Sequence, residues 1–279
     1  MRIVKNEKVI QARGRWARIL MPLGLVFLVG GLILSLQTGN QTSQILAWAA
    51  LIGGVLCSSF GIGLADKWLS VPGRPRADQA LETALNALDI KHKLYSWSLP
   101  AAEQVMLSPA GLTVFLVKSQ EGVVQCQDGK WKNKLSILKM LSSLSRERLG
   151  NPTKDLDRHI AQVKQLATAA APDSDIPVDG IIVFTNAAAQ LQVEDCADNV
   201  ATPETLRNKF REVTGGGKRI TDTAYRQIEE AFDNLAGPEV TTTTQTATRA
   251  TGTPRQGGRF AKDSSRKSSG AKATKKSGK

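Results

Sequence analysis

The chain has 279 residues and a formal net charge of +12, with 37 Lys and Arg against 25 Asp and Glu. This length allows one ordinary domain plus additional segments. The positive excess lies at the two ends, in residues 1–18 and after Gly237, while the central part is close to neutral. The charge therefore argues against a strongly basic nucleic-acid surface on a central domain.

Two uncharged apolar segments follow the basic start, at residues 19–36 and 45–65. Helices over these segments would extend roughly 27 and 31 Å, close to the ~30 Å hydrocarbon core of a bilayer. Cations flank the outer ends of the pair and the loop between them carries none. The positive-inside rule thus predicts a two-helix anchor in the cell membrane, with both termini in the cytoplasm. Buried core helices or a cleaved signal peptide fit this pattern less well.

Tryptophans and small residues mark the predicted hairpin. Trp16, Trp48 and Trp68 fall near the predicted membrane interfaces, where aromatic side chains gather. Gly54, Ser58 and Gly61 would allow the helices to pack closely. Because glycine is frequent in membrane helices in any case, we favour the view that these residues have no special role.

The remaining segments differ in composition. Residues 66–76 read as a linker, and residues 77–214 as the predicted domain. The domain opens with residues 76–89, whose leucines lie on one helical face. Residues 215–236 start with three glycines and predict one further helix. Residues 237–279 have few apolar side chains, which predicts a disordered basic tail.

The most informative stretch reads as two strands joined by a tight turn. A short apolar run, Val105–Leu107, is followed by Ser108-Pro109-Ala110-Gly111 and by the β-prone run Leu112–Val117. Glu103 precedes the first strand and Lys118 ends the second. A metal-dependent phosphodiesterase uses such a pair, because the acid holds a divalent cation and the lysine positions or activates water.

Strands and helices alternate through the rest of the domain. The signals are a hairpin around Asp128-Gly129, a helix after Asn151-Pro152, a strand at Val178–Phe184 and a helix start at Thr202-Pro203. This alternation predicts an α/β domain. The two histidines match no ligand spacing, and the three cysteines are read as free thiols in a reducing compartment.

The stretch from Glu103 to Gly122 resembles the nuclease-related domain called NERD, a branch of the PD-(D/E)XK nuclease superfamily. That pattern has an acid, two hydrophobic residues, an SP-x-G turn and a strand that ends in E-x-K. Ser108, Pro109, Gly111 and Lys118 match it, and Glu103 stands at the place of the acid. The resemblance, which covers about residues 77–213, implies a restriction-endonuclease-like mixed sheet in a prokaryotic nuclease-related protein.

The resemblance also implies a set of site residues. Glu103 and Lys118 would be catalytic, and Asp78 and Glu103 would hold Mg²⁺ or Mn²⁺. For Asp78 the alternative is an ordinary helix-start aspartate, favoured by the helix dipole. Leu116 stands where the family has the glutamate of E-x-K. A leucine cannot bind a hard cation, so part of the chemistry is missing.

Two functions follow from these expectations. The first is a membrane-anchored NERD-like protein that has lost catalysis and binds nucleic acid or the membrane surface. Besides the lipid bilayer, its partners would be DNA or anionic lipid, held by the basic tail at 237–279. The alternative is an active DNA nuclease that hydrolyses phosphodiesters with Mg²⁺ or Mn²⁺.

Overall fold

The computed structural model describes residues 1–36, 41–70, 75–134, 149–193, 196, 199–216, 219–238 and 240–245. All of these lie in one unit of the chain, residues 1–247. From residue 246 onward the predicted disordered tail lies outside the described residues, as does part of the predicted linker.

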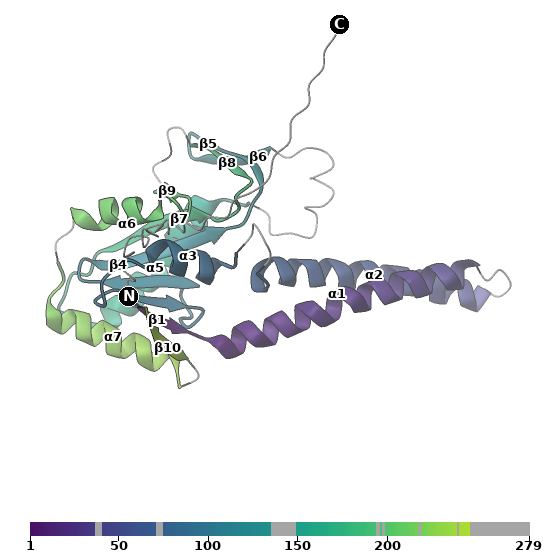
Figure 1. The fold of residues 1–279 in the computed structure, drawn as a ribbon, viewed down its shortest axis with the longest axis horizontal. Helices are drawn as coiled ribbons and strands as arrows, with labels where there is room; N and C mark the ends of the chain where they lie inside the picture. Colours follow the sequence, from purple (N-terminus) through teal and green to yellow (C-terminus); the bar gives the residue numbers. More distant parts are fainter. Residues whose placement is uncertain are drawn as a thin grey trace, which may run out of the picture. The chain divides into compact units, whose positions relative to one another are not determined.

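The described elements follow the chain as drawn in Figure 1. They are β1 (Arg2–Lys5), α1 (Glu7–Leu36), α2 (Gln41–Trp68), α3 (Ala77–Leu85), β2 (Lys93–Ser96), β3 (Gln104–Ser108), β4 (Gly111–Lys118), β5 (Gly122–Gln127), β6 (Lys130–Lys134), α5 (Pro152–Ala170), β7 (Val178–Phe184), β8 (Ala189–Val193), β9 (Val200–Ala201), α6 (Leu206–Gly215), α7 (Asp222–Ala236) and β10 (Thr241–Thr244). Four predicted elements are confirmed. They are the central strand pair, the hairpin around Asp128-Gly129, the helix after Asn151 and the strand at 178–184.

The main sheet has seven strands in the order β10-β1-β2-β3-β4-β7-β9. β2, β3 and β4 are antiparallel neighbours, whereas β4 runs parallel to β7, and β1 runs parallel to β2. One buried cluster joins the sheet to α5 and α7, and a second joins its other face to α3 and α6. The domain is therefore α/β with a mixed sheet, as predicted.

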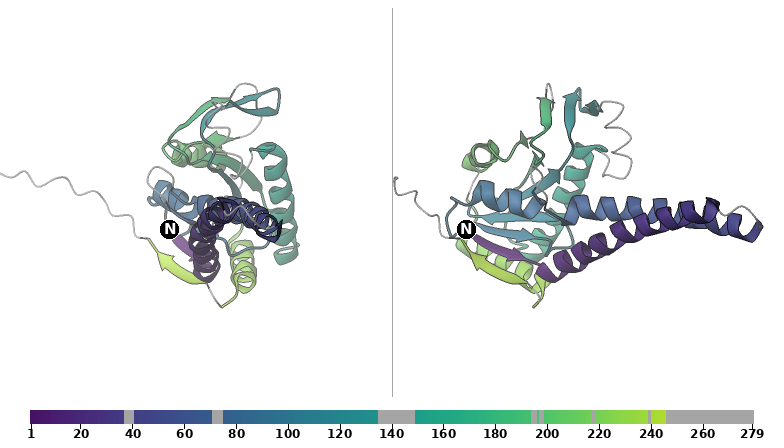
Figure 2. Two further views of the ribbon diagram at one scale, coloured as in Figure 1. Left: turned by 90° about the vertical axis from the view of Figure 1, so that its right-hand side faces the viewer. Right: turned by 45° about the vertical axis from the view of Figure 1, so that its right-hand side comes forward.

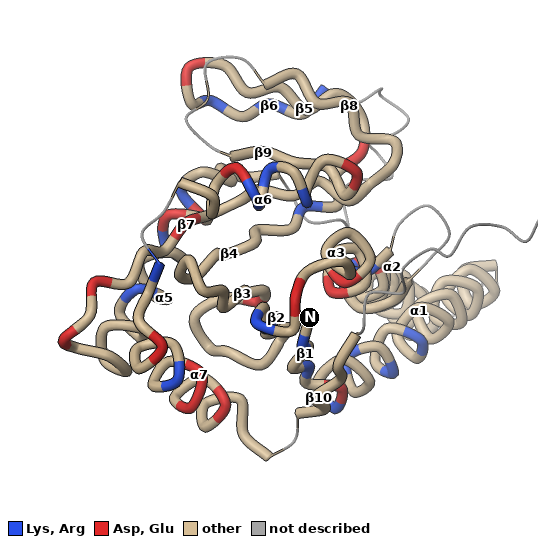
Figure 3. Tube along the Cα trace, turned by 60° about the vertical axis from the view of Figure 1, so that its left-hand side comes forward, with Lys and Arg blue, Asp and Glu red and all other residues tan. Residues whose placement is uncertain are grey.

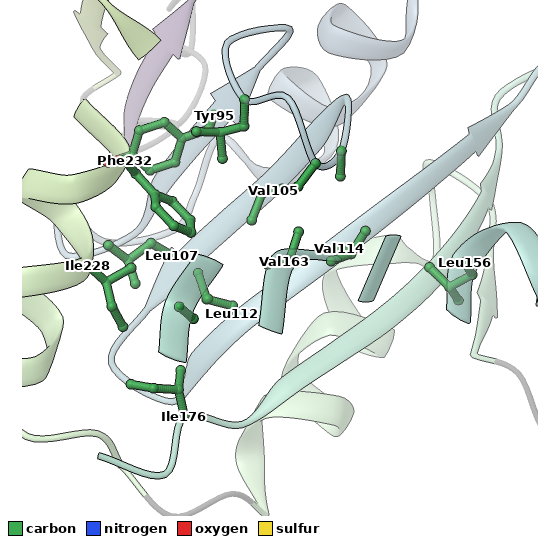
Figure 4. Packing of buried hydrophobic residues seen from close by; sticks show 14 of the residues in the cluster. Tyr95, Val105, Leu107, Leu112, Val114, Leu156, Val163, Ile176, Ile228 and Phe232 are labelled. Carbon is green, nitrogen blue, oxygen red and sulfur yellow. The ribbon is translucent and has the colours of Figure 1, made fainter. Parts of the chain in front are cut away.

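The side chains of β4 alternate between these two clusters. Leu112 and Val114 belong to the cluster under α5 and α7, whereas Phe115 belongs to the one under α3 and α6. Figure 4 shows the first cluster, with Val163 of α5 and Phe232 of α7 among its members. A strand covered on both faces needs an almost continuous apolar run, which explains the uncharged β-prone run Leu112–Val117 in β4.

The turn between β3 and β4 explains its sequence. The Ser108 hydroxyl donates to the carbonyl of Gly111 at 3.0 Å and accepts from the amide of Ala110 at 3.2 Å. Gly111 has a φ of +128°, and a Cβ there would lie 2.5 Å from the carbonyl oxygen of Pro177. Only glycine fits such a backbone next to such a neighbour.

Helices α1 and α2 lie side by side as a hairpin (Figure 2). A Cβ on Gly54 would lie 2.9 Å from the backbone nitrogen of Leu28, and one on Gly61 would lie 2.8 Å from that of Met21. A Cβ on Gly24 would meet the backbone of Ser58 at 2.6 Å. The expectation that Gly54 and Gly61 have no special role was wrong, because together with Gly24 they allow the two backbones to approach closely.

The surface of the hairpin is apolar. Both helices are long and apolar enough to cross a membrane. Large side chains such as Val26, Leu36 and Phe60 are mostly exposed, which is unlike the core helices of a soluble protein. Lys and Arg occupy the part of α1 next to the sheet and are absent farther along the hairpin (Figure 3).

The sequence led us to expect a separate basic segment at residues 1–18. The structure shows otherwise. Residues 2–5 form β1, which inserts between β10 and β2, and α1 already begins at Glu7. Ile3 and Val4 are buried on opposite faces of the sheet. Likewise β10 lies inside the segment predicted to be disordered. Four-residue strands are too short to show a period in the sequence, whereas their neighbours in the sheet stabilise them.

A separate three-stranded sheet has the order β6-β5-β8. Asp128 and Gly129 have φ values of +50° and +70°, as a two-residue hairpin turn requires. Cys126 in β5 and Cys196 form a disulfide, while Cys57 is free. The expectation of three free thiols was therefore wrong. A sequence separation of 70 residues gave no pattern from which this pair could be predicted.

Candidate functional site

A cavity of about 610 Å³ opens where α2 ends, β4 ends and α5 begins. Its wall includes Lys67, Glu103, Leu116, Lys118, Asp155 and His159. Lys118 is the last residue of β4, so the parallel pairing of β4 with β7 places the cavity at the carboxyl ends of both strands. Ligand sites in α/β sheets commonly lie at such an edge.

Glu103, the expected metal ligand, faces a lysine from the hairpin. Its Oε1 lies 2.5 Å from Nζ of Lys67, in the last turn of α2. The two side chains are 45% and 40% exposed, so this ion pair contributes at most about 1 kcal/mol to stability. The pair nevertheless neutralises the carboxylate that a divalent cation would need.

Lys118 and Asp155 approach each other inside the cavity. Lys118 is buried, and its Nζ lies 3.9 Å from Oδ2 of Asp155. The other carboxylate oxygen of Asp155, Oδ1, pairs with Arg158 at 3.2 Å. Asp155 lies in the first turn of α5, where the Asn151 side chain caps the helix. Sequence reasoning identified this helix start and missed its acid, since nothing in the local pattern tells which wall α5 faces.

Leu116 lines the same cavity. The position at which the sequence resemblance led us to expect a glutamate therefore lines this cavity. The leucine side chain has no oxygen atom that could bind a hard cation such as Mg²⁺. The leucine at position 116 thus gives the cavity wall an apolar side chain where a glutamate was expected.

Asp78 does not line the cavity but lies in a buried ion-pair cluster. Arg76 donates to both of its oxygens, at 3.0 and 2.7 Å, and Nζ of Lys5 lies 3.0 Å from Oδ2. Burial by itself raises the pKa of Asp78, but Arg76 and Lys5 outweigh burial and hold this pKa below its ordinary value. Lys5 also pairs with Glu82, whose pKa is raised by burial. Asp78 thus joins β1 to α3.

The residues expected to hold Mg²⁺ or Mn²⁺ do not fit that ion. Asp78 and Glu103 are each bound to basic side chains, and Asp78 is not part of the cavity wall. In the part of the chain that the structure describes, no three His, Cys, Asp or Glu side chains come together as a metal site.

The three tryptophans expected at the membrane interfaces differ. Trp16 and Trp48 are 60% and 67% exposed on the hairpin, whereas Trp68 is buried against the ring of Trp97, with centroids 4.4 Å apart. The guanidinium of Arg13 lies 4.8 Å from the Trp68 ring, and Nζ of Lys67 lies 5.3 Å from the Trp97 ring. The Arg13 contact joins α1 to α2, whereas Trp68 and Lys67 attach the end of α2 to the domain through Trp97.

Trp97 has a φ of +57°, an uncommon backbone conformation for a bulky side chain. Its amide donates to the carbonyl of Glu103 at 2.7 Å, and both residues line the cavity. His159 uses Nδ1 to contact the carbonyl oxygen of Ala101 at 2.8 Å, which is a structural role. The strained tryptophan, the hairpin and the cavity thus form one connected site.

Fold and site together define a mixed α/β domain with an apolar helical hairpin attached beside the cavity that holds Glu103 and Lys118. Comparison of the chain with family models, with curated proteins and with solved structures finds no match.

Proposed function

We propose that this chain is a membrane-anchored, nuclease-related protein of the NERD kind that binds nucleic acid or the membrane surface without cutting its ligand. The observation that carries the proposal is the wall of the cavity. Leu116 occupies the place of a carboxylate there, and Lys67 neutralises Glu103. Because phosphodiester hydrolysis of this type depends on carboxylate-bound metal, the missing carboxylate weakens metal binding, and a cation would also have to displace Lys67 from Glu103.

The order of elements supports a restriction-endonuclease-like core. α3 is followed by the antiparallel strands β2, β3 and β4, and α5 then crosses over to β7, which is parallel to β4. The lysine at the end of β4 lies at the site edge of this sheet, as the NERD resemblance implies.

A second candidate is an active nuclease dependent on Mg²⁺ or Mn²⁺. The observation in its favour is that Asp155 brings a carboxylate into the cavity that holds Glu103 and Lys118. In that case Asp155 would take over part of the role lost at Leu116, and Lys67 would have to release Glu103.

We expect the purified full chain to retain duplex DNA and to leave it uncut in the presence of Mg²⁺ or Mn²⁺. Retention should fall steeply with salt, because cations that meet phosphates release counterions. Removal of residues 246–279 should weaken it, since these residues carry ten Lys and Arg. Gel retardation measures binding, and a denaturing gel of the same samples measures cleavage.

Matched variants separate the candidates. A tail of the same composition in scrambled order should bind as well as the natural one, because the contact depends on charge alone. Leu116→Glu restores a carboxylate to the cavity and is the variant in which weak cleavage should appear. Wild-type cleavage that disappears in Glu103→Ala and in Lys118→Ala would refute the proposal in favour of the active nuclease. Competition by anionic vesicles shows whether lipid shares the binding surface.

The orientation of the hairpin is part of the proposal. β1 precedes α1 and pairs with β2, which follows α2, so the two flanks of the hairpin lie on the same side of any membrane that it spans. Cations on both flanks favour the cytoplasm. The disulfide points the other way, because disulfides are uncommon in cytosolic proteins. We give priority to the charges, which act on insertion directly.

Reporter fusions at Gln41 and at Lys279 are expected to report opposite sides of the membrane, with Lys279 in the cytoplasm. The reason is that the cations flank the hairpin and its connecting loop carries none. A cytoplasmic enzyme reporter and a periplasmic one, fused at each position in turn, measure this arrangement. Signals from the same side at both positions would contradict it.

A further inference from the structure

A second hollow lies at the other end of the strands. The first cavity holds Lys118, the last residue of β4, whereas this one holds Pro109 in the turn that leads into β4. It has a volume of about 500 Å³ and lies between this turn, the residues before β2 and the start of α7. In Figure 1 the start of α7 lies at the end of the domain opposite the hairpin. The hollow therefore faces away from the proposed membrane.

The charge around this hollow is positive and largely uncompensated. Four cations line it, Arg2, Lys91, Arg219 and Arg226, against the two carboxylates of Asp222 and Glu229. Glu229 is already bound by Arg2 at 2.5 Å and by Lys93 at 2.9 Å. Among the described residues, Lys91, Arg219 and Arg226 have no carboxylate partner. With Glu229 already paired, these three cations outnumber the one remaining carboxylate of the lining, Asp222, and such an excess of positive charge favours an anionic ligand.

The floor of the hollow is already ordered by hydrogen bonds. The Tyr225 hydroxyl donates to the carbonyl of Lys91 at 2.8 Å and accepts from Nη2 of Arg2 at 3.0 Å. Arg2 also donates through Nε to the carbonyl of Ile90 at 3.1 Å. The amide of Ile220 donates to the carbonyl of Pro109 at 3.0 Å. A ligand would meet a preformed wall, which lowers the entropy cost of binding.

That wall is apolar and aromatic where it is not basic. Ile90, Pro109, Ile220 and the ring of Tyr225 all line the hollow. Ile90 is 62% exposed, although it is a large apolar residue. An adjoining cavity of about 310 Å³ shares Lys91, Pro109 and Arg219 with this hollow. The cations Lys91 and Arg219 therefore line both cavities. Volumes of about 300–1,000 Å³ are usual for sites of small ligands.

We propose that this hollow binds a nucleoside phosphate. The phosphate group would lie on Lys91, Arg219 and Arg226, because guanidinium groups match phosphate oxygens in charge and in planar geometry. The base would lie against Tyr225 and Ile90. Both a free nucleotide and the phosphorylated end of a nucleic-acid chain offer this chemistry. The site is independent of the loss of catalysis proposed above, since it lies at the opposite end of the strands.

The test is calorimetric titration of the full chain in lipid nanodiscs with adenosine monophosphate at about physiological salt. The double variant Arg219→Gln/Arg226→Gln should lower the affinity at least tenfold, because it removes the charged hydrogen bonds that two guanidinium groups make to the phosphate. The control Arg211→Gln/Lys154→Gln removes two exposed cations elsewhere and should change the affinity by less than about twofold. All four side chains are exposed, so neither variant is expected to unfold.

Three results would overturn the proposal. They are no saturable binding of adenosine monophosphate, an equal loss of affinity in both variants, and binding of inorganic phosphate as tight as that of the nucleotide. The second would mean that binding follows net charge, including that of the tail. A 5′-phosphorylated oligonucleotide that displaces the nucleotide would identify the ligand as a nucleic-acid end, and one that fails to displace it would identify a free nucleotide.

Discussion

Replacing Asp78 by alanine is expected to lower the free energy of unfolding by about 3 kcal/mol or more, because breaking a buried ion pair leaves its partners unpaired. Asp78 is fully buried and pairs with both Arg76 and Lys5, of which Lys5 would keep only its pair with Glu82. For a domain of this size, the loss corresponds to a fall in melting temperature of about 6–12 °C. Thermal unfolding of the full chain in detergent measures it.

The effect of this substitution should depend on pH. The pKa of Asp78 in the folded chain is lowered, so its contribution to stability is present above the unfolded pKa of about 4 and is lost as the pH falls through the folded pKa. The difference between wild type and Asp78→Ala should thus be full at pH 7 and shrink below about pH 4. Asp157→Ala, an exposed control on α5, should change stability by less than about 0.5 kcal/mol.

This experiment also separates the two interpretations of Asp78. If Asp78 holds the fold together, its truncation lowers the stability of the protein whether or not a divalent cation is present. If Asp78 is instead a metal ligand surrounded by other acids, its truncation raises the stability of the protein in the absence of the cation, because repulsion between the acids is relieved. A melting temperature that is unchanged or raised by Asp78→Ala would contradict the structural role.

A fragment that begins at residue 75 is expected to be poorly folded, because it lacks β1. Ile3 and Val4 are 2% and 1% exposed, and burying two such side chains contributes about 3–6 kcal/mol. Without β1, the edge of β2 would also be open for pairing with other chains. Joining residues 1–6 to residue 75 by a flexible Gly/Ser linker, in place of the hairpin, should restore a monomeric domain.

The matched control keeps the linker and changes the strand. Ile3→Asp/Val4→Asp has the same length but cannot bury these positions, so it should behave like the fragment without β1. Size-exclusion chromatography gives the monomeric fraction, and thermal unfolding gives the stability. Equal behaviour of the linked protein and this control would show that β1 is dispensable.

Several features of this protein follow from its sequence alone, because their causes are local. The lengths of two uncharged runs predict the hairpin, and turn chemistry at Ser108–Gly111 with the apolar run after it predicts β3 and β4. The α/β class follows in the same way from the alternation of elements. In each case neighbouring residues carry the whole signal.

Other features were decided by the tertiary structure. Glu103 meets Lys67 across 36 residues, and Asp78 meets Lys5 across the whole hairpin. The place of Asp155 beside Lys118, the pairing of β1 with β10 and the disulfide likewise join distant segments. A side chain's charge and size can be read from the sequence, but its partner depends on how helices pack and strands pair. Whether an acid can hold a metal ion or is bound by a lysine is therefore settled only in the folded chain.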